Sequence, residues 1–329
     1  MSDLLVDGCA RPVTYLRISV TDRCNFSCCY CTPSKPNPRL SHEDILRFEE
    51  ILTIARIGLD LGIRKIRITG GEPLVRKGLL PFLRTLGQLP GLERLALTTN
   101  GMLLEDALPF LREAGVHQIN LSLDTLDPEK FRKITGKDAF HVVWRALTAA
   151  LDTEAFTLKL NAVALRGVNE ADLLPLALLA QKWPISVRFI EEMPIGHAQK
   201  KTGSPLLVPE IQKHLMPLGP LTPLASGFTD GPAQRFTFPG AKGEIGFIPA
   251  LSRHFCKTCN RLRLTANGRL RPCLLSDAST DIRTALRQHE DENTLKALFH
   301  KSLRHKGAEH VFEPGGTGQV DTAMARIGG

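Results

Sequence analysis

The sequence predicts an α/β fold in which parallel strands form a barrel around a polar interior. Short apolar runs alternate with longer helical patterns six times over the first two-thirds of the chain, which is typical of a parallel sheet. Polar residues at the centres of these runs favour a barrel over an open, doubly wound sheet. A length of 329 residues suffices for one large barrel or for two ordinary domains.

The pattern places the elements of this barrel in order along the chain. Six strands are expected, at residues 16–20, 65–69, 94–98, 118–124, 157–163 and 186–190. Five helices are expected between them, at residues 41–61, 78–88, 103–114, 140–151 and 170–181. Ser41 followed by Asp44 has nearly the spacing of a capping box, and Asp127 and Asn169 are suitable N-caps for later helices.

Nearly every predicted strand has a polar residue near its middle, whereas buried parallel strands usually read as continuous apolar runs. The interrupting residues are Arg17, Arg67, Thr98, Ser122, Lys159 and Arg188. Burying an unpaired cation is costly, so these side chains are expected to face a polar lumen or an anionic ligand. The alternative is that one or two of them lie at strand ends and reach solvent.

The strand–helix rhythm ends near residue 205. Six prolines between residues 209 and 239, together with frequent glycines, interrupt it. Short strands at residues 234–238 and 244–248 indicate a second, antiparallel region that ends in a helical tail. The sequence therefore predicts two regions, residues 1–205 and residues 206–329.

Composition excludes several classes of protein. No apolar run approaches the roughly 18 residues of a membrane span, and the N-terminal MSDLLVDGCARP lacks the pattern of a secretory signal. The net charge of +8 suits a phosphorylated small molecule as well as nucleic acid, but only 6% of residues are aromatic, which disfavours nucleic-acid binding. A cytoplasmic location is expected, where clustered cysteines hold metals more often than they form disulfides.

Three cysteines with the spacing C-x3-C-x2-C follow the first predicted strand: Cys24, Cys28 and Cys31. Three thiolates can ligate three irons of a 4Fe-4S cluster and leave the fourth iron open to a chelating cofactor. A zinc site is the alternative, but it normally uses four ligands in two closer pairs. The end of a barrel strand is also where active sites of such barrels lie. Cys29 is interpreted as a bystander, because adjacent cysteines cannot easily face one small cluster.

A second set of cysteines has the spacing C-x2-C-x13-C: Cys256, Cys259 and Cys273. His254 can complete a zinc site, so zinc is an alternative for this set. Arg261 and Arg263 alternate along the next predicted strand and place two guanidiniums beside the metal. Such planar forks suit phosphate. A metal with an open position beside an anion clamp indicates a substrate-binding cluster.

The first cysteine loop resembles that of the radical S-adenosylmethionine (SAM) superfamily, and residues 70–73 are similar to its GGEP segment. From about Arg11 to the last residue, the chain resembles more specifically the GTP 3′,8-cyclases of molybdenum cofactor biosynthesis. The segments that carry the resemblance are SVTDRCNFSCCYC, IRITGGEPLVR, LTTNG, SLDTLDPEKFRKITG, VRFIEEMPIG, CNRLRLTANG and MARIGG. The chain departs from the family at Thr32, where a methionine is usual, and in the extra thiol of Cys29.

The resemblance implies a partial (β/α)6 TIM-type barrel with SAM and one 4Fe-4S cluster, and a C-terminal α+β region that carries a second 4Fe-4S cluster and closes the open side. It also implies the reaction, in which a 5′-deoxyadenosyl radical removes the 3′-hydrogen of GTP and the ribose radical attacks C8 of the purine. The implied partners are an external one-electron reductant and the next enzyme, cyclic pyranopterin monophosphate synthase. The chain is expected to be a monomer or a homodimer.

Site residues follow from positions in the matching segments. Those implied for SAM are Tyr30, Gly71, Ser122 and Met193. Those implied for GTP are Arg17, Arg67, Thr98, Lys159, Arg261 and Arg263, with Arg188 expected in the same lumen. The tail residues Arg326, Gly328 and Gly329 are implied to reach the active site, whereas the residues alone favour a disordered end.

Two other functions fit part of the sequence. A peptide-modifying radical SAM enzyme usually has more than three C-terminal cysteines and often a peptide-binding domain ahead of the barrel, and this sequence indicates neither. A zinc-stabilised nucleic-acid-binding protein fits the positive charge and the cysteines but does not explain the GGEP segment or the barrel rhythm.

Overall fold

The first strand shows how the sequence builds a two-sided sheet. In β1 (Tyr15–Ser19), Leu16 and Ile18 are fully buried on one face, and Arg17 lies between them on the other. A computed structural model describes residues 4–31, 39–193, 195, 204–225, 231–252, 255–309, 320 and 322–328. All of its strands belong to one sheet of twelve.

Eight parallel strands form the centre of this sheet, in the order β10-β1-β2-β3-β4-β5-β6-β9. Their bounds are β1 (Tyr15–Ser19), β2 (Lys65–Thr69), β3 (Arg94–Thr99), β4 (Val116–Ser122), β5 (Thr157–Ala164), β6 (Ser186–Glu191), β9 (Glu244–Ile248) and β10 (Arg261–Leu264). The order ends at β12 on one side and β7 on the other, so within the described residues the barrel is open. The predicted fold class, a partial barrel, is confirmed.

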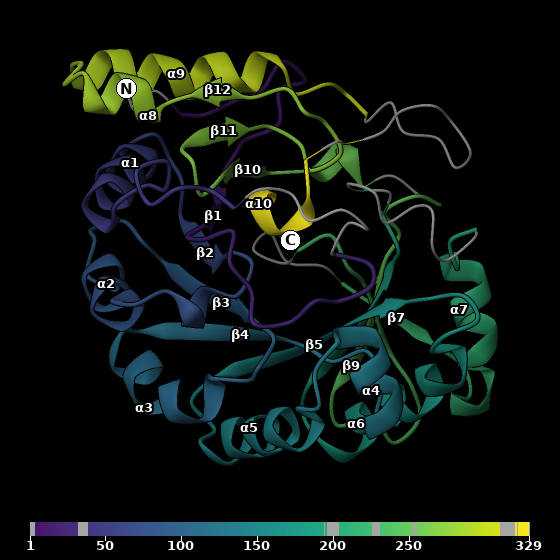
Figure 1. Cartoon of the computed structure of the whole chain (residues 1–329). Coiled ribbons are helices and arrows are strands. Elements are labelled where there is room, and N and C mark those ends of the chain that lie inside the picture. Colours follow the sequence, from purple (N-terminus) through teal and green to yellow (C-terminus); the bar gives the residue numbers. More distant parts are fainter. Residues whose placement is uncertain are drawn as a thin grey trace.

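Helices pack on the outer face of the curled sheet (Figure 1). They are α1 (Phe48–Asp60), α2 (Leu79–Gly87), α3 (Leu104–Glu113), α4 (Pro128–Thr135), α5 (Phe140–Asp152) and α6 (Leu173–Lys182). In α1 the apolar face contains Ile51, Ile54 and Ile57, each at most 1% exposed. This outer layer leaves the inner face of the sheet to polar side chains.

The antiparallel pairing predicted after residue 205 is present between β8 (Gln234–Thr237) and β9, but both strands belong to the same sheet as the barrel. Strand β9 continues the barrel in parallel beside β6, and β10 does the same beside β1. Antiparallel pairs join β9 to β8 and β8 to β7 (Thr222–Leu224) on one side. On the other side they join β10 to β11 (Arg269–Arg271) and β11 to β12 (Thr280–Asp281). The C-terminal strands thus narrow the gap in the barrel from both edges.

Helix starts are where the local prediction was least accurate. The helix expected from Ser41 begins at Phe48, because Ser41 and Asp44 bond to each other in a preceding turn. Asp127 caps α4 as expected, accepting from the N–H groups of the next turn, although α4 itself was not predicted. Asn169 uses its side chain to hold Leu165 and other loop groups and makes no capping bond.

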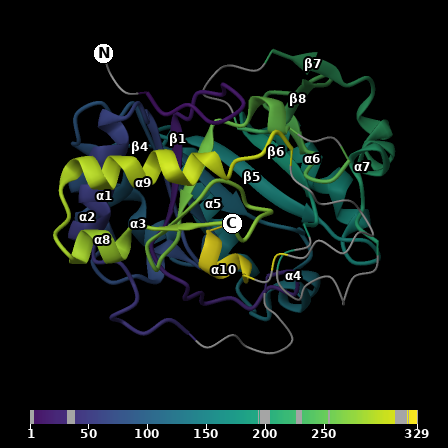
Figure 2. The same ribbon diagram turned by 90° about the horizontal axis from the view of Figure 1, so that it is seen from above.

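The remaining helices are α7 (Val208–His214), α8 (Arg283–Arg287), α9 (Glu292–Arg304) and α10 (Met324–Ile327). In Figure 1, α9 lies along the top of the molecule and α10 lies inside the curl of the sheet. Seen from above, α9 crosses the face of the molecule nearest the viewer (Figure 2). Among the described residues, no helix is long and apolar enough to cross a membrane.

Candidate functional site

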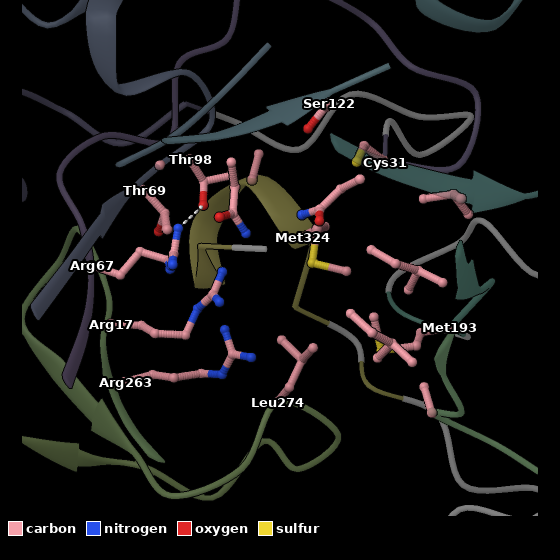
Figure 3. A pocket seen from close by; sticks show the side chains of 18 of the residues that line it. Arg17, Cys31, Arg67, Thr69, Thr98, Ser122, Met193, Arg263, Leu274 and Met324 are labelled. Atoms are coloured by element: carbon pink, nitrogen blue, oxygen red, sulfur yellow. Dashed lines mark hydrogen bonds between the residues drawn. The ribbon is translucent and has the colours of Figure 1, made fainter. Parts of the chain in front are cut away.

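A cavity of about 600 Å³ occupies the barrel lumen, and its volume is typical of a small-molecule site. All six polar strand residues singled out from the sequence line it: Arg17, Arg67, Thr98, Ser122, Lys159 and Arg188. Figure 3 shows the side chains of Arg17, Arg67 and Arg263 converging on one side of this space. The expectation that these residues face a lumen, and not solvent at strand ends, agrees with their positions.

Three arginines form a row across adjacent strands. Arg17 on β1 is in register with Arg263 on β10 and with Arg67 on β2. Burial and the neighbouring charges of Arg17 and Arg261 lower the pKa of Arg263 well below its usual range. Like charges directly opposite one another on neighbouring strands are destabilising, so this row is suited to a polyanionic ligand.

A second row lies two residues earlier on the same three strands and contains a tyrosine between two cations. Tyr15 is in register with Lys65 on β2 and Arg261 on β10. Its hydroxyl accepts a bond of 2.5 Å from Nε of Arg67, and Nζ of Lys65 lies 5.0 Å from its ring centre. Burial raises the pKa of Tyr15, but the charges of Arg67, Arg17 and Lys65 outweigh it and lower the pKa to about 6. Tyr15 is therefore expected to ionise more readily than an ordinary tyrosine and to offset part of the positive charge around it.

The first cysteine loop opens into the same cavity. Cys24, Cys28 and Cys31 all line it, whereas Cys29 is not among the lining residues. The Sγ atom of Cys24 accepts hydrogen bonds from the backbone of Phe26 at 3.4 Å and from Nδ2 of Asn100 at 3.7 Å. Burial raises the pKa of Cys24 above its usual value, and these two donors oppose that rise. The arrangement supports the interpretation of Cys29 as a bystander.

The GGEP segment supports the cysteine loop from behind. A Cβ atom at Gly71 would lie 2.3 Å from the carbonyl oxygen of Arg23, so glycine is required for the loop to pack here. The side chain of Glu72 accepts from Oγ1 of Thr99 and from the backbone of Asn100. The glycines were expected to allow close approach of SAM, and the structure adds that they allow close approach of the cysteine loop.

The second cysteine set faces the same cavity from the β10 side. All three of its thiols line the cavity, and His254 lies outside the described residues. Burial raises the pKa of Cys259, but the charges of Arg261 and Lys306 lower it to about 6. This thiol is thus ready to act as a thiolate ligand at neutral pH.

The residues expected at SAM lie at or after the carboxyl ends of β1, β2, β4 and β6. The hydroxyl of Tyr30 donates to Oδ2 of Asp124 at 2.7 Å. This bond holds the end of the cysteine loop against the segment that follows β4. Ser122 ends β4, and Met193 lies in the cavity wall across from the arginine row (Figure 3). Gly71 and Tyr30 line the cavity as well.

The C-terminal tail enters the lumen. Arg326 lines the cavity, and Nη1 of Arg263 donates to the carbonyl oxygen of Gly328 at 2.7 Å. Gly328 has φ +78°, and a Cβ atom there would lie 2.3 Å from Oγ1 of Thr69. Gly329 lies outside the described residues. Up to Gly328, the tail is therefore a packed element of the site, in contrast to the disordered end that the residues alone favour.

Two family profiles match the chain, "Radical SAM superfamily" over residues 18–180 and "Molybdenum Cofactor Synthesis C" over residues 185–312. A protein named GTP 3′,8-cyclase from Heliobacterium modesticaldum is 44% identical over 99% of this chain and 100% of its own length. A protein of the same name from Moorella thermoacetica is 46% identical over 98% of this chain and 99% of its own. This chain belongs to the GTP 3′,8-cyclase family of radical SAM enzymes.

Solved structures of Streptococcus suis SuiB share the fold. The match to SuiB bound to S-adenosylmethionine covers 89% of this chain with a TM-score of 0.58. The match to SuiB bound to precursor peptide SuiA also covers 89% of this chain, with a TM-score of 0.64. These matches cover 68% and 67% of the SuiB chains. Sequence identity is 14% in both, so the likeness shows the architecture of a radical SAM barrel alone.

The described residues of this family member fit iron–sulfur clusters. All eight cysteines are free thiols, and six of them face one cavity in two groups of three. Among the described residues, no three His, Cys, Asp or Glu side chains surround a position for a single metal ion. The thiolates of a 4Fe-4S cluster bind different iron atoms, so they need not converge on one point.

The sequence prediction missed several cavity residues that share a simple signal. They are Tyr15, Lys65, Asn120 and Asn161. Each lies two positions from a predicted lumen residue on the same strand, and side chains two apart in a strand share a face. The Oδ1 atom of Asn161 is buried without a hydrogen-bond partner in the described structure and lines the cavity, so a ligand there could supply a donor to it.

Proposed function

We propose that this chain is the GTP 3′,8-cyclase that its family name implies, with GTP as substrate and SAM as cosubstrate. The observation that supports it best is the row formed by Arg263, Arg17 and Arg67, which lies in one cavity with two three-cysteine sets. A triphosphate supplies the negative charge that this row needs.

The two ends of the cavity receive different ligands in this proposal. GTP contacts come from Arg17, Arg67, Thr98, Lys159, Arg261 and Arg263. SAM contacts come from Tyr30, Gly71, Ser122 and Met193. Thr98 Oγ1 lies 3.3 Å from Nη1 of Arg67, so a ligand held by one is within reach of the other.

Each cysteine set holds one 4Fe-4S cluster in this proposal, Cys24, Cys28 and Cys31 on the SAM side and Cys256, Cys259 and Cys273 on the GTP side. When bound, the first cluster and SAM supply a radical that takes the 3′-hydrogen of GTP. A bond then forms between C3′ and C8, and one electron and one proton complete the dihydro product. The side chains around GTP hold its ribose and purine in the geometry that this bond requires.

The tail completes the GTP side. Gly328 is held by Arg263, a member of the arginine row, and Arg326 is two residues upstream. We place Arg326, Gly328 and Gly329 near the reacting ribose, to which they would contribute backbone and guanidinium donors. An external one-electron reductant and cyclic pyranopterin monophosphate synthase, as acceptor of the product, are the proposed partners.

The test is anaerobic incubation of the reconstituted protein with SAM, a reductant and each nucleoside triphosphate in turn, with products analysed by mass. Among the nucleoside triphosphates, only GTP is expected to react; its product, 3′,8-cyclo-7,8-dihydro-GTP, has the same mass as GTP and is separated from it by chromatography before mass analysis, and 5′-deoxyadenosine is formed with it. Cleavage of SAM with no change in any nucleotide, but with modification of an added peptide, would instead identify a peptide-modifying enzyme.

A further inference from the structure

Three charged side chains are buried together behind the second cysteine set. Asp7 and Arg11 belong to the N-terminal segment and Lys306 follows α9, yet their exposed fractions are only 5%, 8% and 5%. Nε of Arg11 donates to Oδ2 of Asp7 at 2.7 Å, and Nζ of Lys306 lies 3.7 Å from the same oxygen. Buried charges are costly unless they are paired and hydrogen-bonded, so the position of these three calls for an explanation.

The first cation of this cluster bonds directly to a cysteine of the second set. Nη1 of Arg11 donates to the carbonyl oxygen of Cys256 at 2.6 Å. The same guanidinium donates to the carbonyl oxygens of Gly307 at 2.7 Å and Ala308 at 3.1 Å, so it joins the cysteine turn to the segment after α9. Asp7 fixes its orientation through Nε.

The second cation holds the next cysteine of the same set. Nζ of Lys306 donates to the carbonyl oxygen of Cys259 at 2.7 Å and to that of Arg261 at 2.9 Å. Each cysteine of the C-x2-C pair therefore has its own carbonyl bonded to a buried cation. The loop of the first set is held by neutral bonds, from the N–H groups of Ser27 and Cys29 to the carbonyls of Thr135 and Ile134.

We propose that Arg11 and Lys306, oriented by Asp7, are positioning residues that hold the Cys256–Cys259 turn and favour the reduced state of the cluster bound there. The proposal rests on the proposed function, in which this turn ligates a 4Fe-4S cluster. Two cations and one carboxylate leave one excess positive charge behind the turn. Reduction adds a negative charge to the cluster, and a buried positive charge nearby stabilises that state more than the oxidised one.

Charge and hydrogen bonding can be separated at Lys306. Lys306→Gln keeps a donor but removes the charge, whereas Lys306→Arg keeps both. If Lys306 acted only through packing and hydrogen bonds, the reduction potential of the cluster would not differ between variants that keep the charge and variants that remove it. Lys301, exposed on α9, offers a matched control, because Lys301→Gln removes the same charge from the surface of the preceding helix.

The experiment uses the full chain with Cys24, Cys28 and Cys31 changed to Ala, so that only the second cluster is present. Iron content and an anaerobic redox titration followed by electron paramagnetic resonance are measured for this parent and for each variant in its background. Lys306→Gln and Arg11→Gln are expected to shift the potential to more negative values and to speed iron loss to a chelator. Lys306→Arg and Lys301→Gln are expected to match the parent.

The outcomes separate this inference from the proposed function. A parent protein that contains no iron would show that the second cysteine set holds no cluster, which would contradict both the proposed function and the role of Arg11 and Lys306. A parent with four irons whose potential is the same in Lys306→Gln and Arg11→Gln would refute the electrostatic role alone. Should Lys306→Gln hold no iron while Lys306→Arg does, the positioning role is supported. Loss of iron in both Lys306→Gln and Lys306→Arg, with the fold intact by circular dichroism, contradicts the role of charge.

Discussion

Tyr15 illustrates how one residue changes the chemistry of its neighbours. A phenol between Arg67, Arg17 and Lys65 provides the negative charge that this crowded group of cations lacks in the absence of a ligand. Its side chain lies in the cavity wall, so an entering polyanion meets cations that are already partly neutralised. The phenolate and the triphosphate are therefore expected to compete for the same positive potential.

The ionisation of Tyr15 can be measured directly, because the sequence contains only two tyrosines. The pKa of the other, Tyr30, is raised well above its usual value by burial and by Asp124. Metal-free protein is thus expected to show one phenolate titration near pH 6 in ultraviolet difference spectra, and Tyr15→Phe is expected to lack it. GTP should move this titration to higher pH. A titration only near pH 10 would show that the cations do not act on Tyr15.

The same shift predicts how stability depends on pH. In the unfolded chain a tyrosine has a pKa of about 10. Because the folded pKa is lower, the ionised group stabilises the fold; its contribution is fully present above the unfolded value and is lost as pH falls through about 6. The free energy of unfolding of the protein, relative to Tyr15→Phe, is therefore expected to fall as the pH is lowered from about 10 to about 6, as measured by urea denaturation. An unchanged difference across this range would contradict the assignment.

The arginine row gives the sharpest test of substrate binding. Removing one guanidinium from a desolvated anion pair typically costs about 2–5 kcal/mol. Arg17→Ala, Arg67→Ala and Arg263→Ala are each expected to weaken GTP binding at least tenfold, measured by calorimetry, while iron content stays constant. Arg112→Ala, on the exposed face of α3, is the control. Unchanged affinity in all three row variants would refute the assignment of the lumen to GTP.

At the scale of single residues, much of the site could be predicted. The sequence identified Arg17, Arg67 and Lys159 as site residues, because a cation within a buried parallel strand must face a polar interior or an anionic ligand. Tyr15 escaped because an aromatic residue in a strand is also an ordinary core residue. Arg11 and Lys306 escaped because their partners are backbone carbonyls some 245 and 47 residues away in the chain, and no local pattern reports such contacts.

At the scale of elements, the bounds of the inner strands were well predicted, but which strands pair with one another was not. The apolar alternation of β2 and β9 is local, so their bounds followed from the sequence. That β9 and β10 extend the barrel in parallel depends on pairing between distant segments, which strand composition does not encode. The false start at Ser41 has a similar origin, since a Ser–Asp pair caps a turn as readily as a helix.

The terminal element α10 leads to a prediction about the tail. Gly328→Ala would place a methyl group 2.3 Å from Oγ1 of Thr69 at a φ of +78°, so the end of the tail must leave its position. This variant, and deletion of residues 328–329, are expected to abolish the cyclised product while sparing iron content and uncoupled SAM cleavage. A few residues appended after Gly329 should be nearly as damaging.

The control for the tail is Gly8→Ala, where an added Cβ would meet no atom within 4 Å. It is expected to behave as the parent in folding, iron content and product formation. Cyclisation at the parental rate after deletion of residues 328–329 would show that the tail has no part in the reaction.

At the scale of the whole molecule, the two cysteine sets should contribute equally to metal content. Two 4Fe-4S clusters give about eight irons per chain and negligible zinc after anaerobic reconstitution. Changing Cys24, Cys28 and Cys31 to Ala should halve the iron and abolish SAM cleavage, whereas Cys29→Ala should change neither. Stoichiometric zinc with only four irons would overturn the assignment of the Cys256 set.

The pairing of β1 with β10 also has a consequence for the newly made chain. Tyr15 and Arg261 are register partners, so the edge of β1 has no neighbour on that side until the ribosome has added 246 further residues (261 − 15). At synthesis rates of roughly 5–20 residues per second, this wait lasts on the order of 10–50 s. Throughout that time the first cysteine loop is tethered to an unprotected strand edge, open to aggregation and, where present, to oxygen. A chain that stalls or terminates before β10 would keep that edge open, so covering β1 depends on synthesis of the C-terminal region.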